Sequence, residues 1–242
     1  MEWRTDALVL RAIDYGENDK ILTLLTPSGK VTAGMRGVRK PKAKLGFAAQ
    51  PFCFAEYVFA TRGDRNTVVS AYLHEGFYPL RTDILRYYAA CAVAEICDSL
   101  TGESVDARAV FIAAIECLKE LSLTERDAAE TLVTFALIAV REGGYAIDLD
   151  GCGVCGGEIG KEPCFDLAAG YFTCDECSSG VRAKPETYEY LRKCSGLSYQ
   201  DGFTDAGRRA LRLLRAYLTE KTESDYPCFK EFLALYAADN AE

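Results

Sequence analysis

The sequence predicts an α+β chain with an N-terminal five-stranded β-barrel, followed by a helical region that carries a module of four cysteines. Three observations predict it. Short runs rich in β-branched and aromatic residues alternate with turns up to about residue 76, helical spacing begins at Arg81, and two Cys-x-x-Cys pairs follow. We expect three units in the 242 residues: 1–78, 79–150 with 180–242, and 151–179.

The N-terminal unit is predicted to be a small closed barrel of the OB type, because a long connection precedes the fourth of its five runs. The predicted strands are Ala7–Ile13, Lys20–Thr26, Lys30–Met35, Pro51–Ala60 and Thr67–Leu73. Aromatic side chains on such strands can stack on bases or fill the barrel. Both interpretations are open at this stage for Phe54, Tyr57, Phe59 and Tyr72.

A cationic loop is predicted after the third strand, where five cations occur in nine residues without an acid: Arg36, Arg39, Lys40, Lys42 and Lys44. The whole chain has a formal net charge of −8, yet residues 1–76 carry eleven Lys or Arg against eight Asp or Glu. Local potential governs contact with a polyanion, so we expect these side chains, with Arg62 and Arg65 in the next turn, to bind phosphates. A solvated charged loop is the alternative.

Helical spacing predicts helices from Arg81 to Leu100, over Val105–Leu121 and from Thr124 to Gly143. Thr124 is expected to cap the third helix, with Asp127 in its first turn. Three more are predicted at Pro185–Cys194, Thr204–Thr219 and Pro227–Ala238, the middle one with an arginine row at 208, 209, 212 and 215. Solvation is the expected role of that row, and nucleic-acid contact is the alternative.

The strongest chemical signal is the cysteine pattern. Cys152 and Cys155 are separated by eighteen residues from Cys174 and Cys177, which matches the spacing of a tetrathiolate zinc site. Four thiolates saturate tetrahedral Zn²⁺, so we expect one structural zinc ion. A redox pair, a disulfide and a site that has lost its metal are the alternatives, and Cys164 between the pairs could confuse the ligand set.

Several function classes are excluded or disfavoured. The single histidine, His74, argues against triad and histidine-rich metal catalysis. The phosphate-loop, dinucleotide-binding and nucleophile-elbow motifs are all missing from the sequence, which favours a non-enzymatic protein that uses no nucleotide. We expect no membrane segment and an intracellular location, in which cysteines are thiols or metal ligands.

Three groups of residues resemble bacterial recombination mediators of the RecO family. They are Thr5–Leu10 with Tyr15–Thr23, the segment Arg36–Lys40 with Gln50–Phe52, and Gly144–Tyr145 ahead of the two cysteine pairs. The resemblance covers about residues 4–180. It implies an OB fold that binds single- and double-stranded DNA, a helical domain and a zinc module.

The resemblance also implies a function and a set of partners. Members of the family anneal complementary strands without ATP, bind the C-terminal tail of single-stranded DNA-binding protein, and with RecR load RecA in recombinational DNA repair. A cytoplasmic, nucleoid-associated location follows. Two alternatives from other classes stay open: a zinc-containing protein that binds RNA or acts in transcription, and a metal-dependent nuclease.

Overall fold

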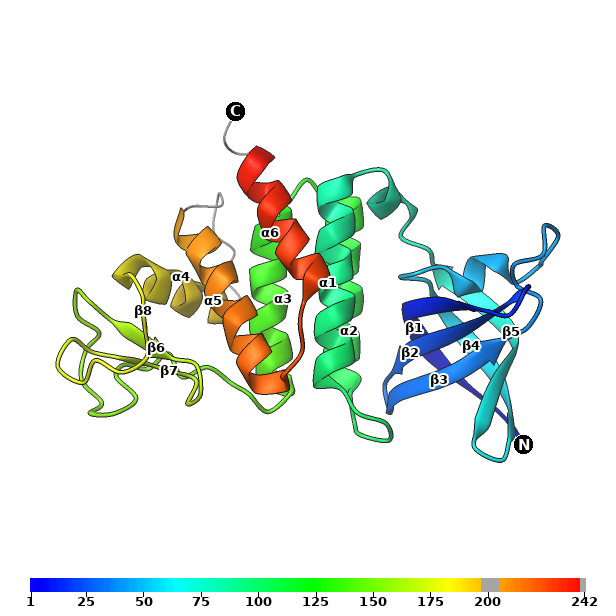
Figure 1. The fold of residues 1–242 in the computed structure, drawn as a ribbon, viewed down its shortest axis with the longest axis horizontal. Helices are drawn as coiled ribbons and strands as arrows, with labels where there is room; N and C mark the ends of the chain where they lie inside the picture. The colour runs from blue at the N-terminus through cyan, green and yellow to red at the C-terminus, as the bar shows by residue number, and fades with distance from the viewer. Residues whose placement is uncertain (197–204, 240–242) are drawn as a thin grey trace.

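The computed structural model describes residues 1–196 and 205–239. A barrel, a row of helices and a small module with short strands follow one another along the long axis of the molecule (Figure 1). The barrel and the helices confirm the predicted fold class. The start of the helix predicted at Thr204 lies outside the described residues.

Five strands form the barrel: β1 (Glu2–Tyr15), β2 (Asp19–Thr26), β3 (Gly29–Met35), β4 (Phe54–Arg62) and β5 (Arg65–Glu75). Their order around the closed sheet is β1-β2-β3-β5-β4, with β3 and β5 parallel and the other neighbours antiparallel. Short 3₁₀ helices lie at Gly46–Ala49 and Tyr78–Arg81. The predicted five-stranded OB-type barrel is therefore confirmed.

The aromatic residues of the barrel divide between its core and its surface. Tyr57 and Phe59 are fully buried, and the Tyr57 hydroxyl donates to the carbonyl oxygen of Ala48 at 2.7 Å. Tyr72 is 61% exposed. Phe54 is half-buried and packs beside His74, with ring centroids 4.7 Å apart. Tyr57 and Phe59 are thus core residues, which settles the interpretation that the sequence left open for them.

Six helices follow: α1 (Ile84–Leu100), α2 (Arg108–Leu123), α3 (Ala128–Glu142), α4 (Pro185–Ser195), α5 (Asp205–Thr222) and α6 (Pro227–Asp239). The expected cap at Thr124 is wrong. Asp127 caps α3, because its carboxylate accepts the backbone N–H groups of Ala129 and Glu130 at 2.8 and 3.0 Å. None of the helices in the described residues is long and apolar enough to cross a membrane.

The helices share one hydrophobic core with both of their neighbours. On one side Leu8 and Leu25, from the outer surface of the barrel, pack into it. On the other side Phe165 and Phe172 contribute from a small sheet of β6 (Cys164–Asp166), β7 (Tyr171–Thr173) and β8 (Val181–Arg182). Edge contacts of these rings with Tyr188 and Tyr217 anchor the cysteine module on α4 and α5. The bounds of three separate units stay a prediction.

Candidate metal centre and nucleic-acid interface

The two cysteine pairs meet in one cluster. The sulfur atoms of Cys152, Cys155, Cys174 and Cys177 all lie within 4.8 Å of one another, and Cys155 Sγ is 3.7 Å from Cys174 Sγ. A tetrahedron with Zn–S bonds of about 2.3 Å has sulfur atoms about 3.8 Å apart. The four thiols therefore fit a tetrathiolate metal site without a rearrangement of the backbone.

The first pair lies in a tight turn closed by backbone hydrogen bonds. The Cys152 N–H donates to the carbonyl oxygen of Gly157 at 2.9 Å, and the Gly156 N–H donates back to that of Cys152 at 2.7 Å. Gly153 is required because an added Cβ would lie 2.2 Å from Cγ of Tyr171. Only glycine beside Cys152 therefore lets this turn pack against the Tyr171 ring.

The second pair is tied to the loop that precedes it. The carboxylate of Asp175 accepts the backbone N–H groups of Lys161 and Glu162 at 3.1 and 2.9 Å. Thr173 is buried, and its hydroxyl both donates to and accepts from the backbone of Ser179. These bonds hold the segment that carries Cys174 and Cys177 against the loop before it and close it on itself from Thr173 to Ser179.

The thiols of the cluster differ in acidity. Backbone N–H groups of Cys155 and Cys174 lower the pKa of Cys152 to about 6, because they stabilise its thiolate. Hydrogen bonds with the thiols of Cys155 and Cys174 raise the pKa of Cys177 to about 12. A metal bound by Cys177 would therefore have to displace the proton of its thiol at neutral pH.

Cys164 does not belong to the cluster that the described residues form. It is buried in β6, and its sulfur lies 3.7 Å from the hydroxyl oxygen of Ser178. Cys97 and Cys117 are buried in the helical core, where burial raises the pKa of both thiols. Both therefore pack as small apolar side chains.

The cationic loop after β3 is anchored at its base. Asp19 accepts the Gly37 N–H at 2.7 Å, and the Arg39 N–H donates to the carbonyl oxygen of Asn18 at 2.9 Å. The Arg39 guanidinium pairs with Asp14 at 3.1 Å and donates to two backbone carbonyls of the β1–β2 turn. Arg39 therefore positions the loop, a role that the sequence did not suggest.

The other four cations of the loop do not anchor it as Arg39 does. Arg36, Lys40, Lys42 and Lys44 are exposed, and within residues 1–196 and 205–239 none of them has an ion pair. Four unpaired cations on an anchored loop can contact phosphates without first breaking an internal bond.

Arg62 and Arg65 lie elsewhere on the barrel. They face each other across the β4–β5 turn, beside Thr61, which bonds to the N-terminus of β1. The cationic loop is tied instead to the opposite end of β1, and Figure 1 places the two features at separate corners of the barrel. The structure thus gives two cationic sites on the barrel.

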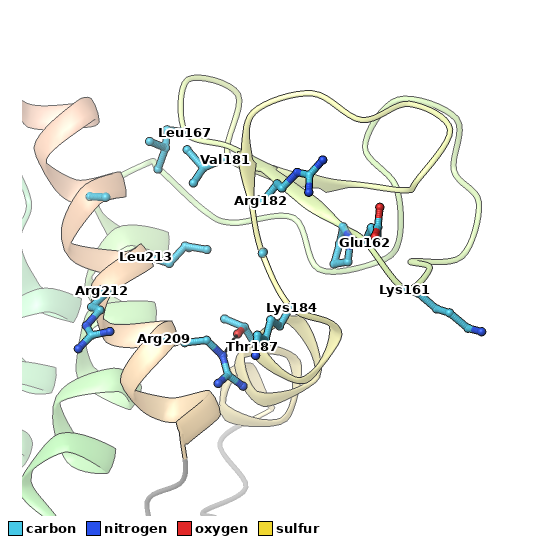
Figure 2. Close-up of a pocket in the computed structure, with 13 residues that line it drawn as sticks. Lys161, Glu162, Leu167, Val181, Arg182, Lys184, Thr187, Arg209, Arg212 and Leu213 are labelled. Atoms are coloured by element: carbon cyan, nitrogen blue, oxygen red, sulfur yellow. Dashed lines mark hydrogen bonds between the residues drawn. The ribbon is translucent and has the colours of Figure 1, made fainter. Parts of the chain in front are cut away.

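A groove of about 560 Å³ separates the cysteine module from α5, a feature that the sequence did not predict. Figure 2 shows Leu167, Val181 and Leu213 pointing toward one another across it. Five cations and one acid also line it: Lys161, Arg182, Lys184, Arg209, Arg212 and Glu162. Two members of the arginine row therefore border a groove, whereas Arg208 and Arg215 pair with Asp205 and Asp225.

Comparison with known proteins agrees with this architecture. The family described as recombination protein O, N terminal, matches residues 1–77, and recombination protein O, C terminal, matches residues 81–227. The chain belongs to the RecO family. The DNA repair protein RecO of Myxococcus xanthus is 36% identical to this RecO-family chain over 204 residues, which cover 81% of each protein.

Two further relatives extend the match over more of the chain. The DNA repair protein RecO of Rubrobacter xylanophilus is 30% identical over 222 residues, 87% of this chain and 89% of that protein. The one of Acetivibrio thermocellus is 28% identical over 234 residues, 92% and 93% of the two chains. The resemblance inferred from the motifs is therefore confirmed.

Proposed function

We propose that this RecO-family chain is a DNA-binding mediator of recombinational repair that anneals complementary single strands without nucleotide hydrolysis. The observation that carries the proposal is the anchored loop with four unpaired cations, Arg36, Lys40, Lys42 and Lys44. Cations that hold phosphates reduce the repulsion between two strands while the bases stay free to pair. Membership of a family whose relatives are called DNA repair proteins supports it.

The test is annealing of complementary oligonucleotides coated with cognate single-stranded DNA-binding protein, without nucleotide. The wild-type chain should accelerate annealing, and a variant with all four free cations of the loop changed to glutamine should not. The matched control changes four exposed cations of the helices to glutamine: Arg108, Lys119, Arg192 and Lys230. Equal annealing by the loop variant and the wild type would refute the proposal, and a Mg²⁺-dependent cleavage product would favour a nuclease.

We propose zinc as the metal of the cysteine cluster, in a structural role. The support is the donor set, because four thiolates satisfy tetrahedral Zn²⁺ and leave no position for a catalytic water. The metal would crosslink the turn at Cys152 to the one at Cys174 and so hold the module on α4 and α5. Metal analysis of protein purified without chelator should give one zinc per chain, and a metal-free but folded protein would refute this assignment.

We propose three protein partners in the bacterial cytoplasm. They are RecR, the RecA recombinase that this chain helps to load together with RecR, and the C-terminal tail of single-stranded DNA-binding protein. The groove beside α5 is a candidate site for the tail. Its lysines and arginines suit an acidic segment, and its leucine and valine side chains suit an apolar side chain of that segment. A labelled tail peptide of the cognate protein should bind the wild type and lose affinity when Leu213 is changed to Asp. Unchanged affinity in the Leu213→Asp variant would place the tail elsewhere.

A further inference from the structure

Trp3 lies near the start of β1 with its ring held in one orientation. It stacks on the ring of Phe59 with a centroid separation of 4.4 Å and an interplanar angle of 23°. Its indole N–H donates to the hydroxyl oxygen of Thr61 at 2.9 Å. Phe59 is fully buried, whereas Trp3 is half-exposed, so the indole caps the aromatic core of the barrel.

The remaining surface of Trp3 borders a cavity of about 490 Å³ on the barrel. The other walls come from the β2–β3 hairpin, the β4–β5 turn and the loop between α1 and α2, which bridges to β3 at Lys30 and Glu103. In Figure 1 the N-terminus, the β4–β5 turn and the α1–α2 loop lie along one edge of the barrel. The cavity is thus formed by segments distant in sequence.

The lining of this cavity is mostly polar and uncharged. Hydroxyl and amide groups predominate: Thr5, Thr26, Ser28, Thr32, Ser104 and Asn66. The lining also holds two cations, Arg4 and Lys30, and two acids, Asp64 and Glu103, and Lys30 is paired with Asp98 outside the lining at 3.0 Å. A cavity with one aromatic wall and many hydrogen-bonding groups, whose lysine is already paired with an acid, suits a flat heterocycle better than a phosphate.

Three arginines lie in or next to the lining of the cavity: Arg4 within it, and Arg62 and Arg65 on the turn that borders it. The side chain of Arg4 is 73% exposed and lies 3.6 Å from Glu56, a separation at which a surface pair is weak. Arg62 and Arg65 are exposed on the β4–β5 turn, whose Asp64 and Asn66 line the cavity. A strand with one base in the cavity would therefore place its neighbouring phosphates within reach of these three arginines.

We propose that this cavity binds one nucleobase of single-stranded DNA, stacked on Trp3. The inference rests on the proposed DNA-binding function and extends it to a second contact, remote from the cationic loop. It gives Arg62 and Arg65 the role of holding the phosphates beside that base. Base stacking on an aromatic ring is tolerant of sequence, which an annealing protein requires.

Trp3 is the single tryptophan of the chain, so its emission reports on this cavity directly. Titration with a thymine oligonucleotide should change the emission and saturate at the concentration at which the anisotropy of the labelled strand saturates. An oligonucleotide of abasic sites supplies phosphates without bases and should leave the emission unchanged. An equal response to both strands would overturn the proposal, because phosphate contact alone would explain it.

Substitution provides the second measurement. Trp3→Leu should weaken single-strand binding by about 5- to 150-fold, whereas Trp3→Phe, which keeps a ring, should retain most of the affinity. Both variants keep an apolar side chain on Phe59, and their thermal unfolding checks that the barrel is folded. The matched control is Tyr78→Leu, an aromatic residue that is 70% exposed outside the barrel strands.

The outcomes separate this inference from the proposed function. If Trp3→Leu binds as tightly as the wild type, with the same dependence on salt, the stacking site is refuted while DNA binding stands. If Trp3→Phe loses as much affinity as Trp3→Leu, the role of Trp3 is structural and the inference is also refuted. If the wild type binds no single strand at all, the proposed function fails and this inference fails with it.

Discussion

Removal of the free cations from the loop after β3 should change how DNA binding depends on salt. We consider a variant in which Arg36, Lys40, Lys42 and Lys44 are all changed to glutamine. These side chains are exposed and free of ion pairs within the described residues, so the substitution breaks no ion pair there. Arg39 is kept, because its guanidinium holds the loop on Asp14 and on the β1–β2 turn.

The magnitude follows from the number of phosphates released. For a single strand, the slope of log K against log salt is about −0.7 for each phosphate neutralised, so four contacts contribute about −2.8. Between about 50 and about 300 mM salt, a contribution of about −2.8 to the slope lowers the binding constant by about 150-fold. Fluorescence anisotropy of a labelled oligonucleotide over that range measures the slope for both proteins.

We expect the slope of the variant to be shallower by about 2.8 units. A control variant with glutamine at Arg108, Lys119, Arg192 and Lys230 has the same net charge and should keep the wild-type slope, because these cations lie on the helices. Equal slopes for wild type and loop variant would refute the reasoning. If the slope of the control becomes as shallow as that of the loop variant, the effect is due to net charge.

Three further predictions concern stability and the metal. Glu95→Ala should lower the free energy of unfolding by about 1–3 kcal/mol in urea titrations, because Glu95 accepts two N–H groups at the start of α6; Glu231→Ala, exposed on the same helix, should have little effect. Metal analysis should find zinc lost from Cys155→Ser but kept in Cys164→Ser, and the reverse would reassign the ligands. A fragment of residues 1–78 should aggregate in size-exclusion chromatography, since it exposes apolar side chains that the helices cover; a monodisperse fragment would support an independent barrel.

Patterns that depend on neighbouring residues predicted the fold well. The third predicted strand alternates apolar and polar residues, and in the barrel Ala33 and Met35 are buried while Thr32 is exposed. The spacing of the two cysteine pairs predicted a cluster because each pair forms its own tight turn. The alternation of a strand and the turn around each cysteine pair both depend on residues that are close in sequence. The sequence alone therefore predicts them.

Features that depend on long-range contacts were missed. Arg39 was grouped with the free cations because its partner Asp14 lies twenty-five residues earlier and meets it only in the folded barrel. Trp3 was overlooked because the first strand was predicted from Ala7, while pairing with β4 extends it back to Glu2. Thr124 and Asp127 are both residue types that cap helices. Asp127 caps α3 because its carboxylate accepts two backbone N–H groups.

The distribution of charge restricts where a strand can lie on this molecule. Residues 77–150 carry thirteen acids against six Lys or Arg, whereas residues 1–76 have an excess of three cations. Because Leu8 and Leu25 of the barrel pack into the helical core, the acidic helices are held against one side of the barrel. Repulsion would then keep the DNA backbone off that side. The cationic loop lies on the side away from the helices, so a strand that contacts it is directed along the outer surface of the barrel, where a second strand can reach its bases.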